Sequence, residues 1–251
     1  MLKVDGLSKS FGGVNAVSDV SFSVDAGAVY SVIGPNGAGK TTLFNLITGV
    51  YTPSAGEIQL GGTSVQNLPP EQLARRGMSR TFQNLQVCMN MSALENVMVG
   101  AHLRLNSSIV AGLLRLPSLR QADNECREEA AGLMEFVGVG RYVATDANQL
   151  PYGALKRLEV ARALAARPQL LLLDEPAAGL NNTETAEIGL LIRKIADKGV
   201  TVVLVEHDMK LVMELSDRVL VMDHGTRLAE GTPAEVRANP DVVAAYLGTV
   251  V

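Results

Sequence analysis

The sequence predicts an α/β fold with a parallel sheet, and three observations support that prediction. Residues 170–173 and 200–205 are continuous apolar runs, typical of parallel strands that are buried on both faces. These two runs flank a helical stretch at residues 183–196, which predicts a βαβ unit. Residues 29–33 are an apolar run that leads into a glycine-rich turn and then a helical pattern at residues 42–48.

The N-terminal part predicts an antiparallel β subdomain. Short β-rich runs, separated by glycine and polar residues, occupy residues 2–7, 18–24 and 29–33 before the glycine-rich turn, and residues 56–60 after it are typical of another strand. We therefore expect an N-terminal sheet, which is the antiparallel β subdomain of the predicted fold.

The middle of the chain changes to a helical pattern between Ser92 and about Val137. Ser92 and Glu95 have the spacing of a capping box, which marks a helix start. Apolar residues recur at helical intervals before Gly138, at Cys126, Ala130, Leu133 and Val137. We interpret residues 84–150 as an inserted α-helical subdomain.

Residues 1–83 and 151–251 then form the core domain around that insertion. The core ends in a helical appendix, because Thr232, Pro233 and Glu235 combine an N-cap, a proline at the first helical position and a capping glutamate.

Composition excludes several classes of protein. The net charge is −4 and the basic residues are scattered, so we expect no nucleic-acid partner. No run reaches the roughly 18 apolar residues of a membrane-spanning helix, and no signal-peptide pattern is present. Cys88 and Cys126 lack metal-ligand spacing, which favours a reducing cytoplasm.

The glycine-rich turn carries the most specific pattern in the chain. Residues 34–41 read G-P-N-G-A-G-K-T, matching a loop whose backbone N–H groups surround phosphate oxygens. Lys40 is expected to reach the β- and γ-phosphates, and Thr41 to ligate Mg²⁺. The predicted nucleotide contacts are Gly34, Pro35, Asn36, Gly37, Ala38, Gly39, Lys40, Thr41 and Thr42.

Asp174 and Glu175 follow a buried strand, where parallel sheets place ligand chemistry. We expect Asp174 to hold Mg²⁺ through water and Glu175 to polarise the water that attacks ATP. The alternative is that both merely cap a strand at a solvent edge.

His207 ends the next apolar run, and Gln83 closes a fourth candidate strand. A histidine after a strand is usually structural, but at this edge His207 could sense the γ-phosphate. Gln83 alone carries no information, because glutamine is common on surfaces.

Taken together, these residues resemble the ATP-binding cassette (ABC) proteins over essentially the whole chain. The resemblance implies a P-loop NTPase (RecA-like) core with the two subdomains above, and ATP and Mg²⁺ as cofactors. It implies that Phe11 stacks on adenine, although a core aromatic is the alternative. It also implies that Gln83 contacts the metal or the attacking water, and that Gly153 acts on the nucleotide of an opposite subunit.

Two departures from the family pattern weaken, without removing, the implied contacts. Residues 150–154 read L-P-Y-G-A in place of L-S-G-G-Q, so Pro151 offers neither a hydroxyl nor an N–H. Gly153 and the helix start beyond it remain able to bind phosphate. Asn181 replaces an aspartate, which removes a charge and keeps hydrogen-bonding capacity.

Three stretches resemble one subfamily, the larger ATPase subunit of branched-chain amino-acid importers: the signature with Tyr152 before Gly153, the run at residues 175–181 and the ending at residues 231–248. That subfamily also has an insertion like residues 103–119. The resemblance implies a second ABC ATPase, in a heterodimer or alternatively a homodimer. It also implies two transmembrane permeases and, indirectly, an extracytoplasmic substrate-binding protein. The location implied is the cytoplasmic face of the inner or plasma membrane, peripheral through the permeases.

Other interpretations stay open at this point. An ABC ATPase of an export or lipid-extraction system would share every catalytic residue. A weakly hydrolysing or non-transport ABC protein would fit the altered signature at residues 150–154.

Overall fold

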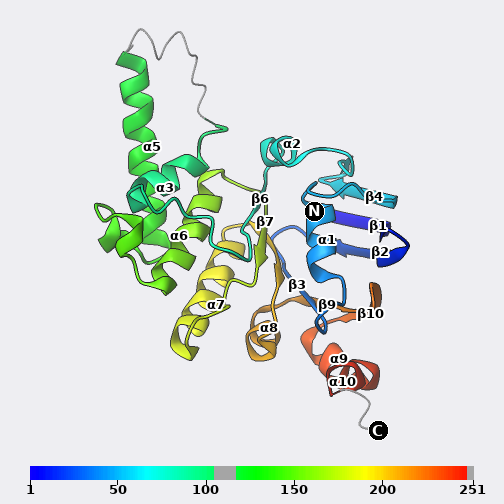
Figure 1. Ribbon diagram of the computed structural model, residues 1–251. Coiled ribbons are helices and arrows are strands. Elements are labelled where there is room, and N and C mark those ends of the chain that lie inside the picture. Colours follow the sequence, from blue (N-terminus) through cyan, green and yellow to red (C-terminus); the bar gives the residue numbers. More distant parts are fainter. Residues whose placement is uncertain (105–116, 248–251) are drawn as a thin grey trace. The chain divides into compact units, whose positions relative to one another are not determined.

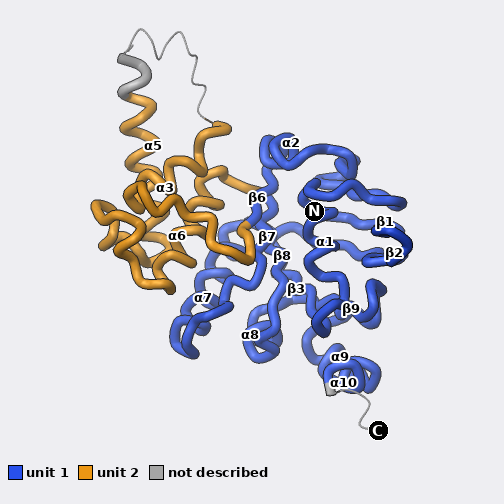
Figure 2. Tube along the Cα trace, viewed as in Figure 1, with its two compact units in different colours: residues 1–80, 169–251 blue, residues 81–168 orange. Residues whose placement is uncertain are grey.

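The computed structural model of the protein describes residues 1–104 and 117–247. The chain forms two compact units, shown in Figure 2. Unit 1 comprises residues 1–80 and 169–251, and unit 2 comprises residues 81–168. Each unit has its own internal packing.

The larger sheet of unit 1 has the strand order β10-β9-β3-β8-β7-β6 (Figure 1). Its strands are β3 (Val29–Ile33), β6 (Met78–Arg80), β7 (Leu170–Asp174), β8 (Thr201–Val205), β9 (Arg218–Asp223) and β10 (Thr226–Gly231). Neighbouring strands are parallel except β9 and β10, which are antiparallel. Every residue of β3, β7 and β8 is buried, which explains their continuous apolar character.

The second sheet of unit 1 is antiparallel throughout and has the order β2-β1-β4-β5. Its strands are β1 (Leu2–Phe11), β2 (Val14–Val24), β4 (Ala55–Leu60) and β5 (Thr63–Ser64). The predicted fold class is therefore confirmed, with a parallel core and an N-terminal antiparallel β subdomain.

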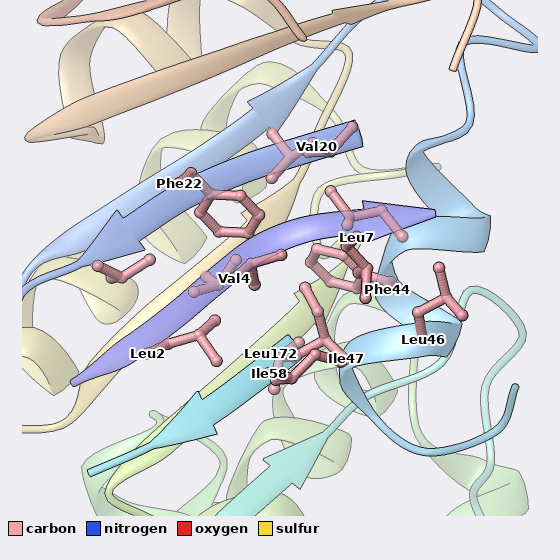
Figure 3. Packing of buried hydrophobic residues seen from close by; sticks show 14 of the residues in the cluster. Leu2, Val4, Leu7, Val20, Phe22, Phe44, Leu46, Ile47, Ile58 and Leu172 are labelled. Carbon is pink, nitrogen blue, oxygen red and sulfur yellow. The ribbon is translucent and has the colours of Figure 1, made fainter. Parts of the chain in front are cut away.

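Helix α1 (Lys40–Ile47) shares one hydrophobic cluster with both sheets. Leu2 and Val4 of β1, Phe44 and Ile47 of α1, and Leu172 of β7 all belong to that cluster (Figure 3). Burying an aliphatic or aromatic side chain of this size contributes roughly 1.5–3 kcal/mol. The cluster thus fixes the helix that begins at the glycine-rich turn.

The remaining helices of unit 1 are α2 (Pro70–Arg75), α7 (Asn182–Ala196), α8 (Met209–Leu215), α9 (Pro233–Ala238) and α10 (Pro240–Leu247). Helix α7 connects β7 to β8, as the predicted βαβ unit requires. The predicted capping box opens α9, where Thr232 N donates to Glu235 Oε2 at 2.7 Å.

Unit 2 is helical, with α3 (Ala93–Gly100), α5 (Pro117–Phe136) and α6 (Tyr152–Ala165), and with short 3₁₀ turns η1 (Gly140–Tyr142) and η2 (Ala147–Gln149). The predicted subdomain, residues 84–150, lies inside unit 2, which continues beyond it through α6. The capping box of Ser92 and Glu95 is present at the start of α3. Most of the predicted insertion at residues 103–119 lies outside the described residues.

An ion cluster ties the segments that follow α3 and α6 to helix α5. Glu129 of α5 accepts hydrogen bonds at 2.9 Å from Arg104, which follows α3, and from Arg167, which follows α6. These hydrogen bonds lower the pKa of Glu129 to about 2, although partial burial opposes them.

One local prediction differs from the structure, and two strands were not predicted. The strand expected to close at Gln83 ends at Arg80, so Gln83 lies in the irregular segment that follows β6. Strands β9 and β10 were not predicted, because Arg218–Asp223 is a short apolar run between charged ends.

Within the described residues, no helix has the length and hydropathy needed to cross a membrane.

Candidate functional site

The glycine-rich turn links β3 to α1 and requires glycine for steric reasons. Gly34 and Gly39 have φ angles of +152° and +95°. A Cβ atom on Gly34 would lie 2.2 Å from the carbonyl oxygen of Met222, and one on Gly39 would lie 2.4 Å from that of Ala16. No side chain could be accommodated at either position without moving the backbone.

Lys40 extends across this turn from the first position of α1. Its side chain is buried, and Nζ donates to the carbonyl oxygens of Gly34 at 2.7 Å and Pro35 at 3.0 Å. Burial lowers the pKa of Lys40, and the nearby carboxylates of Glu175 and Asp174 oppose that shift. The ammonium group is therefore held against the loop and close to two carboxylates of the opposite charge.

The first turn of α1 supplies the remaining polar groups of the loop. Thr41 and Asn36 are exposed, Thr42 is half-buried, and Ala38 is buried. Gly39 is the N-cap of α1, and it provides no side-chain cap for the first N–H groups of the helix. A helix start of this kind presents backbone N–H groups and the positive end of the helix dipole to an anion.

Asp174 and Glu175 are consecutive residues at the carboxyl end of β7, but their backbone conformations differ. Asp174 is still in the strand and is 3% exposed, and its Oδ2 accepts a hydrogen bond from Arg80 at 2.8 Å. Glu175 has a φ of +51°. Non-glycine residues seldom adopt this left-handed conformation, which costs on the order of 1–3 kcal/mol and is found at functional sites. The Glu175 N–H donates to Val205 O at 3.0 Å, which anchors the turn to β8.

The strained turn brings Glu175 into contact with His207. The distance between His207 Nε2 and Glu175 Oε2 is 3.0 Å. Strand β8 ends at Val205, and His207 is the second residue after that end, with Glu206 between them. The two residues come from neighbouring parallel strands that end at the same sheet edge. The prediction that Asp174, Glu175 and His207 lie at this edge is confirmed, whereas their roles stay predictions.

Glu206 was missed by the sequence analysis although it supports both residues. It is 2% exposed and accepts hydrogen bonds from the N–H groups of Ala177 at 2.7 Å and His207 at 3.0 Å. Burial raises the pKa of Glu206, and these backbone hydrogen bonds oppose the shift. Through these two hydrogen bonds the Glu206 carboxylate connects the turn that follows Glu175 to His207.

Phe11 ends β1 and is 42% exposed, so it is not a core aromatic. Its ring packs edge-on against Tyr51, with the centroids 5.3 Å apart, and Lys9 Nζ lies 5.1 Å from its centroid. The sequence analysis did not single out Tyr51, which gives Phe11 a fixed aromatic neighbour.

Asn181 is the N-cap of α7. Its Oδ1 accepts hydrogen bonds from the N–H groups of Thr183 and Glu184, both at 3.0 Å. Glu184 completes the capping box by accepting from Asn181 N at 3.1 Å. An asparagine caps a helix as well as an aspartate does, so the departure at this position preserves the local structure.

In unit 2, Gln83 is exposed on a segment that α6 holds from one side. Glu159 of α6 is 6% exposed, and its Oε1 accepts hydrogen bonds from Phe82 N at 3.5 Å and Gln86 N at 3.4 Å. Arg162, one turn further along α6, donates to Gln86 O. Burial raises the pKa of Glu159 against the effect of these hydrogen bonds.

The altered signature forms the start of the same helix. Pro151 is the N-cap of α6, and no side chain of the described residues caps that helix. Gly153 is buried in the first turn. The segment that carries Gln83 and helix α6, which begins at the altered signature, therefore belong to one unit. Glu159 and Arg162 of α6 form hydrogen bonds to that segment on either side of Gln83.

Comparison with known proteins assigns the family. The profile of the family described as "ABC transporter" matches residues 17–178, more than half of the chain. The chain belongs to the ABC transporter family. A second profile, described as "Branched-chain amino acid ATP-binding cassette transporter", matches residues 226–251 of this cassette.

Relatives of this cassette match over its full length. It is 48% identical to the high-affinity branched-chain amino acid transport ATP-binding protein BraF of Pseudomonas aeruginosa, covering 99% of this chain and 98% of that protein. It is 45% identical to the corresponding protein LivG of Escherichia coli over the same shares. The crystal structure of a nucleotide-free ATP-binding cassette from an ABC transporter superposes with a TM-score of 0.87, at 31% identity and with 99% of each chain covered.

These findings make the protein a nucleotide-binding ABC ATPase whose activity is coupled to transport. The residues of unit 1 fit the groups that the family implies. The turn offers N–H groups and an ammonium group to phosphate, and Thr41 and Asp174 offer the hard oxygen ligands that Mg²⁺ prefers.

Proposed function

We propose that this protein binds and hydrolyses ATP to energise an importer for branched-chain or other hydrophobic amino acids. The observation that carries the proposal is the 45–48% sequence identity to BraF and LivG over 99% of the chain. The match of residues 226–251 to a branched-chain amino acid transporter profile supports it independently of the catalytic motifs.

ATP binding is assigned to unit 1. The N–H groups of the loop from Gly34 to Thr42 and the Lys40 ammonium surround the phosphates, and Phe11 stacks on adenine. Thr41 and Asp174 would hold Mg²⁺, and Gln83, which belongs to unit 2, is the further ligand that we propose. The metal ion neutralises charge on the phosphates when it is bound.

Hydrolysis is assigned to Glu175, which accepts a proton from the attacking water. The 3.0 Å contact with His207 fixes the orientation of the Glu175 carboxylate, and Glu206 holds the backbone of both turns. His207 is also placed to contact the γ-phosphate. These residues meet at the edge of the sheet where α/β proteins bind ligands.

Work on the transporter requires partners. We propose that Gly153 and the N–H groups at the start of α6 contact the nucleotide that is bound to a second ABC ATPase. The two ATPases form a heterodimer or a homodimer. A dimeric ATP-binding cassette with bound ADP and Pi, which has a TM-score of 0.79 at 25% identity, supports this arrangement. Two permeases then place the protein on the cytoplasmic face of the membrane, and an extracytoplasmic binding protein delivers the amino acid.

A trapping experiment tests this function. The variant Glu175→Gln is tagged in its native host, trapped with ATP and Mg²⁺, and purified from solubilised membranes. We expect two polytopic permeases and a second cassette ATPase to co-purify. Glu214→Gln, the same change at an exposed position of α8, controls for tag and charge effects. Recovery of soluble partners alone, or of a single exporter-type membrane protein, would refute the importer.

A further inference from the structure

A buried arginine on β6 contacts the carboxylate that is assigned to Mg²⁺. The Arg80 side chain is 8% exposed, and its Nη2 donates to Asp174 Oδ2 at 2.8 Å. Asp174 itself is 3% exposed. A carboxylate at this depth requires a counter-charge, because an unpaired buried ion is strongly destabilising. Arg80 supplies that charge from the neighbouring parallel strand.

The other terminal nitrogen of Arg80 is bound to helix α1 and its C-cap. Nη1 donates to Asn45 Oδ1 at 2.6 Å and to Thr48 Oγ1 at 2.8 Å. The Thr48 hydroxyl donates its own proton to Phe44 O at 2.7 Å, so its oxygen accepts from Arg80. The guanidinium carbon also lies 5.8 Å from the centroid of the Phe44 ring.

One planar group therefore connects the phosphate-binding helix to the end of β7. Helix α1 begins with Lys40 and Thr41, whereas Asp174 lies 94 positions beyond Arg80 in the sequence. The two terminal nitrogens of a guanidinium keep a fixed separation, and a lysine ammonium cannot hold both sides in that geometry. The position of Asp174 relative to α1 thus depends on the shape of Arg80 as well as on its charge.

We infer that Arg80 is a positioning residue that holds Asp174 in register with α1, and so sets how much Mg²⁺ strengthens ATP binding. This inference rests on the proposed function, since it assumes that Asp174 and Thr41 hold the metal. Arg80 acts through Asp174 and α1, and the proposal requires no contact between Arg80 and ATP.

Titration calorimetry with ATP tests the inference, once with Mg²⁺ and once with EDTA. For Arg80→Lys we expect the affinity for ATP with Mg²⁺ to fall about tenfold, the effect of one charged hydrogen bond. The affinity in EDTA should change by less than about twofold, because the loop and Lys40 are intact. Arg75→Met, at an exposed position of α2, should match the parent in both buffers. Circular dichroism verifies that each variant is folded.

A double substitution tests whether Arg80 acts through Asp174. Asp174→Asn should remove most of the gain from Mg²⁺, and adding Arg80→Met to it should cause no further loss of that gain. An additional loss in the double variant would overturn the inference. So would an equal loss with Mg²⁺ and EDTA for Arg80→Lys, or no loss in either buffer. If the parent protein failed to bind ATP in both buffers, the proposed function would fail, and this inference with it.

Discussion

Units 1 and 2 hold their functional residues by different physical means. In unit 1, Asp174 and Glu175 follow a fully buried strand, and the ladder of the parallel sheet fixes where that strand ends. In unit 2, Gln83 is exposed on an irregular segment, and the buried carboxylate of Glu159 and the guanidinium of Arg162 hold the backbone around it.

This difference determines what a substitution in each unit should change. A side chain on a rigid strand end can be altered while its position persists, so the effect falls on chemistry. A loop that depends on a few side-chain hydrogen bonds loses its position when they are removed, so the effect falls on local mobility. The comparison predicts large kinetic effects in unit 1 and local opening in unit 2.

The largest effect is expected for Glu175→Gln in unit 1. The amide keeps the size of the carboxylate but cannot accept a proton, so ATP turnover should fall about 10²- to 10⁴-fold. ATP affinity should stay within about twofold, since the loop is unchanged. Steady-state phosphate release and calorimetry measure the two quantities. Turnover at the parental rate would show that Glu175 is not the base.

A smaller but still large effect is expected for Gly34→Ala. The new Cβ would meet Met222 O at 2.2 Å, so the loop must shift and ATP affinity should fall by more than about tenfold. Gly199→Ala, outside the loop, is the matched control, because its φ of +89° also disfavours a side chain while no atom lies within 4 Å of the new Cβ. Equal affinities for the two variants would contradict the steric argument.

The sequence locates the residues of unit 1 well because their signals are local. The glycine turn and Asp174-Glu175 can be recognised from the apolar runs directly before them, since a buried parallel strand must end where the apolar run ends. The predicted strands 29–33 and 170–173 accordingly match β3 and β7 to within one residue.

Arg80, Glu159 and Glu206 could not be located in this way. In sequence, a buried charged residue looks like a surface one, because its burial depends on elements far away along the chain. Glu159 contacts a residue 77 positions before it, and Arg80 contacts one 94 positions after it. Only the assembled fold shows that such charges are enclosed and paired.

Glu159→Ala tests the unit 2 side of the comparison. It leaves two N–H groups without their buried acceptor, so amide hydrogen exchange at Phe82 and Gln86 should accelerate about five- to tenfold. Glu159→Gln keeps an acceptor oxygen and should have a smaller effect. The control is Glu128→Ala, at an exposed position of α5. Uniformly faster exchange throughout unit 2 would mean that Glu159 supports the fold as a whole and not this segment.

The smallest effect concerns the ion cluster of unit 2 and appears as a dependence of stability on pH. The pKa of Glu129 is about 2 in the folded protein and near the ordinary 4.5 when unfolded. A lowered pKa stabilises the fold above pH 4.5, and this stabilisation is lost as the pH falls from 4.5 towards 2. Because solvent screens this partly exposed cluster, we expect it to contribute about 1 kcal/mol.

The variant Glu129→Gln isolates that contribution, because glutamine has a similar size and does not titrate. Urea unfolding at pH 6 should show the variant to be less stable than the parent by about 1 kcal/mol. At pH 2.5 the difference should shrink, since Glu129 is then protonated in the unfolded parent, and folding must release that proton to form the cluster. A difference that stays constant between these pH values would mean that packing, and not charge, makes Glu129 stabilising.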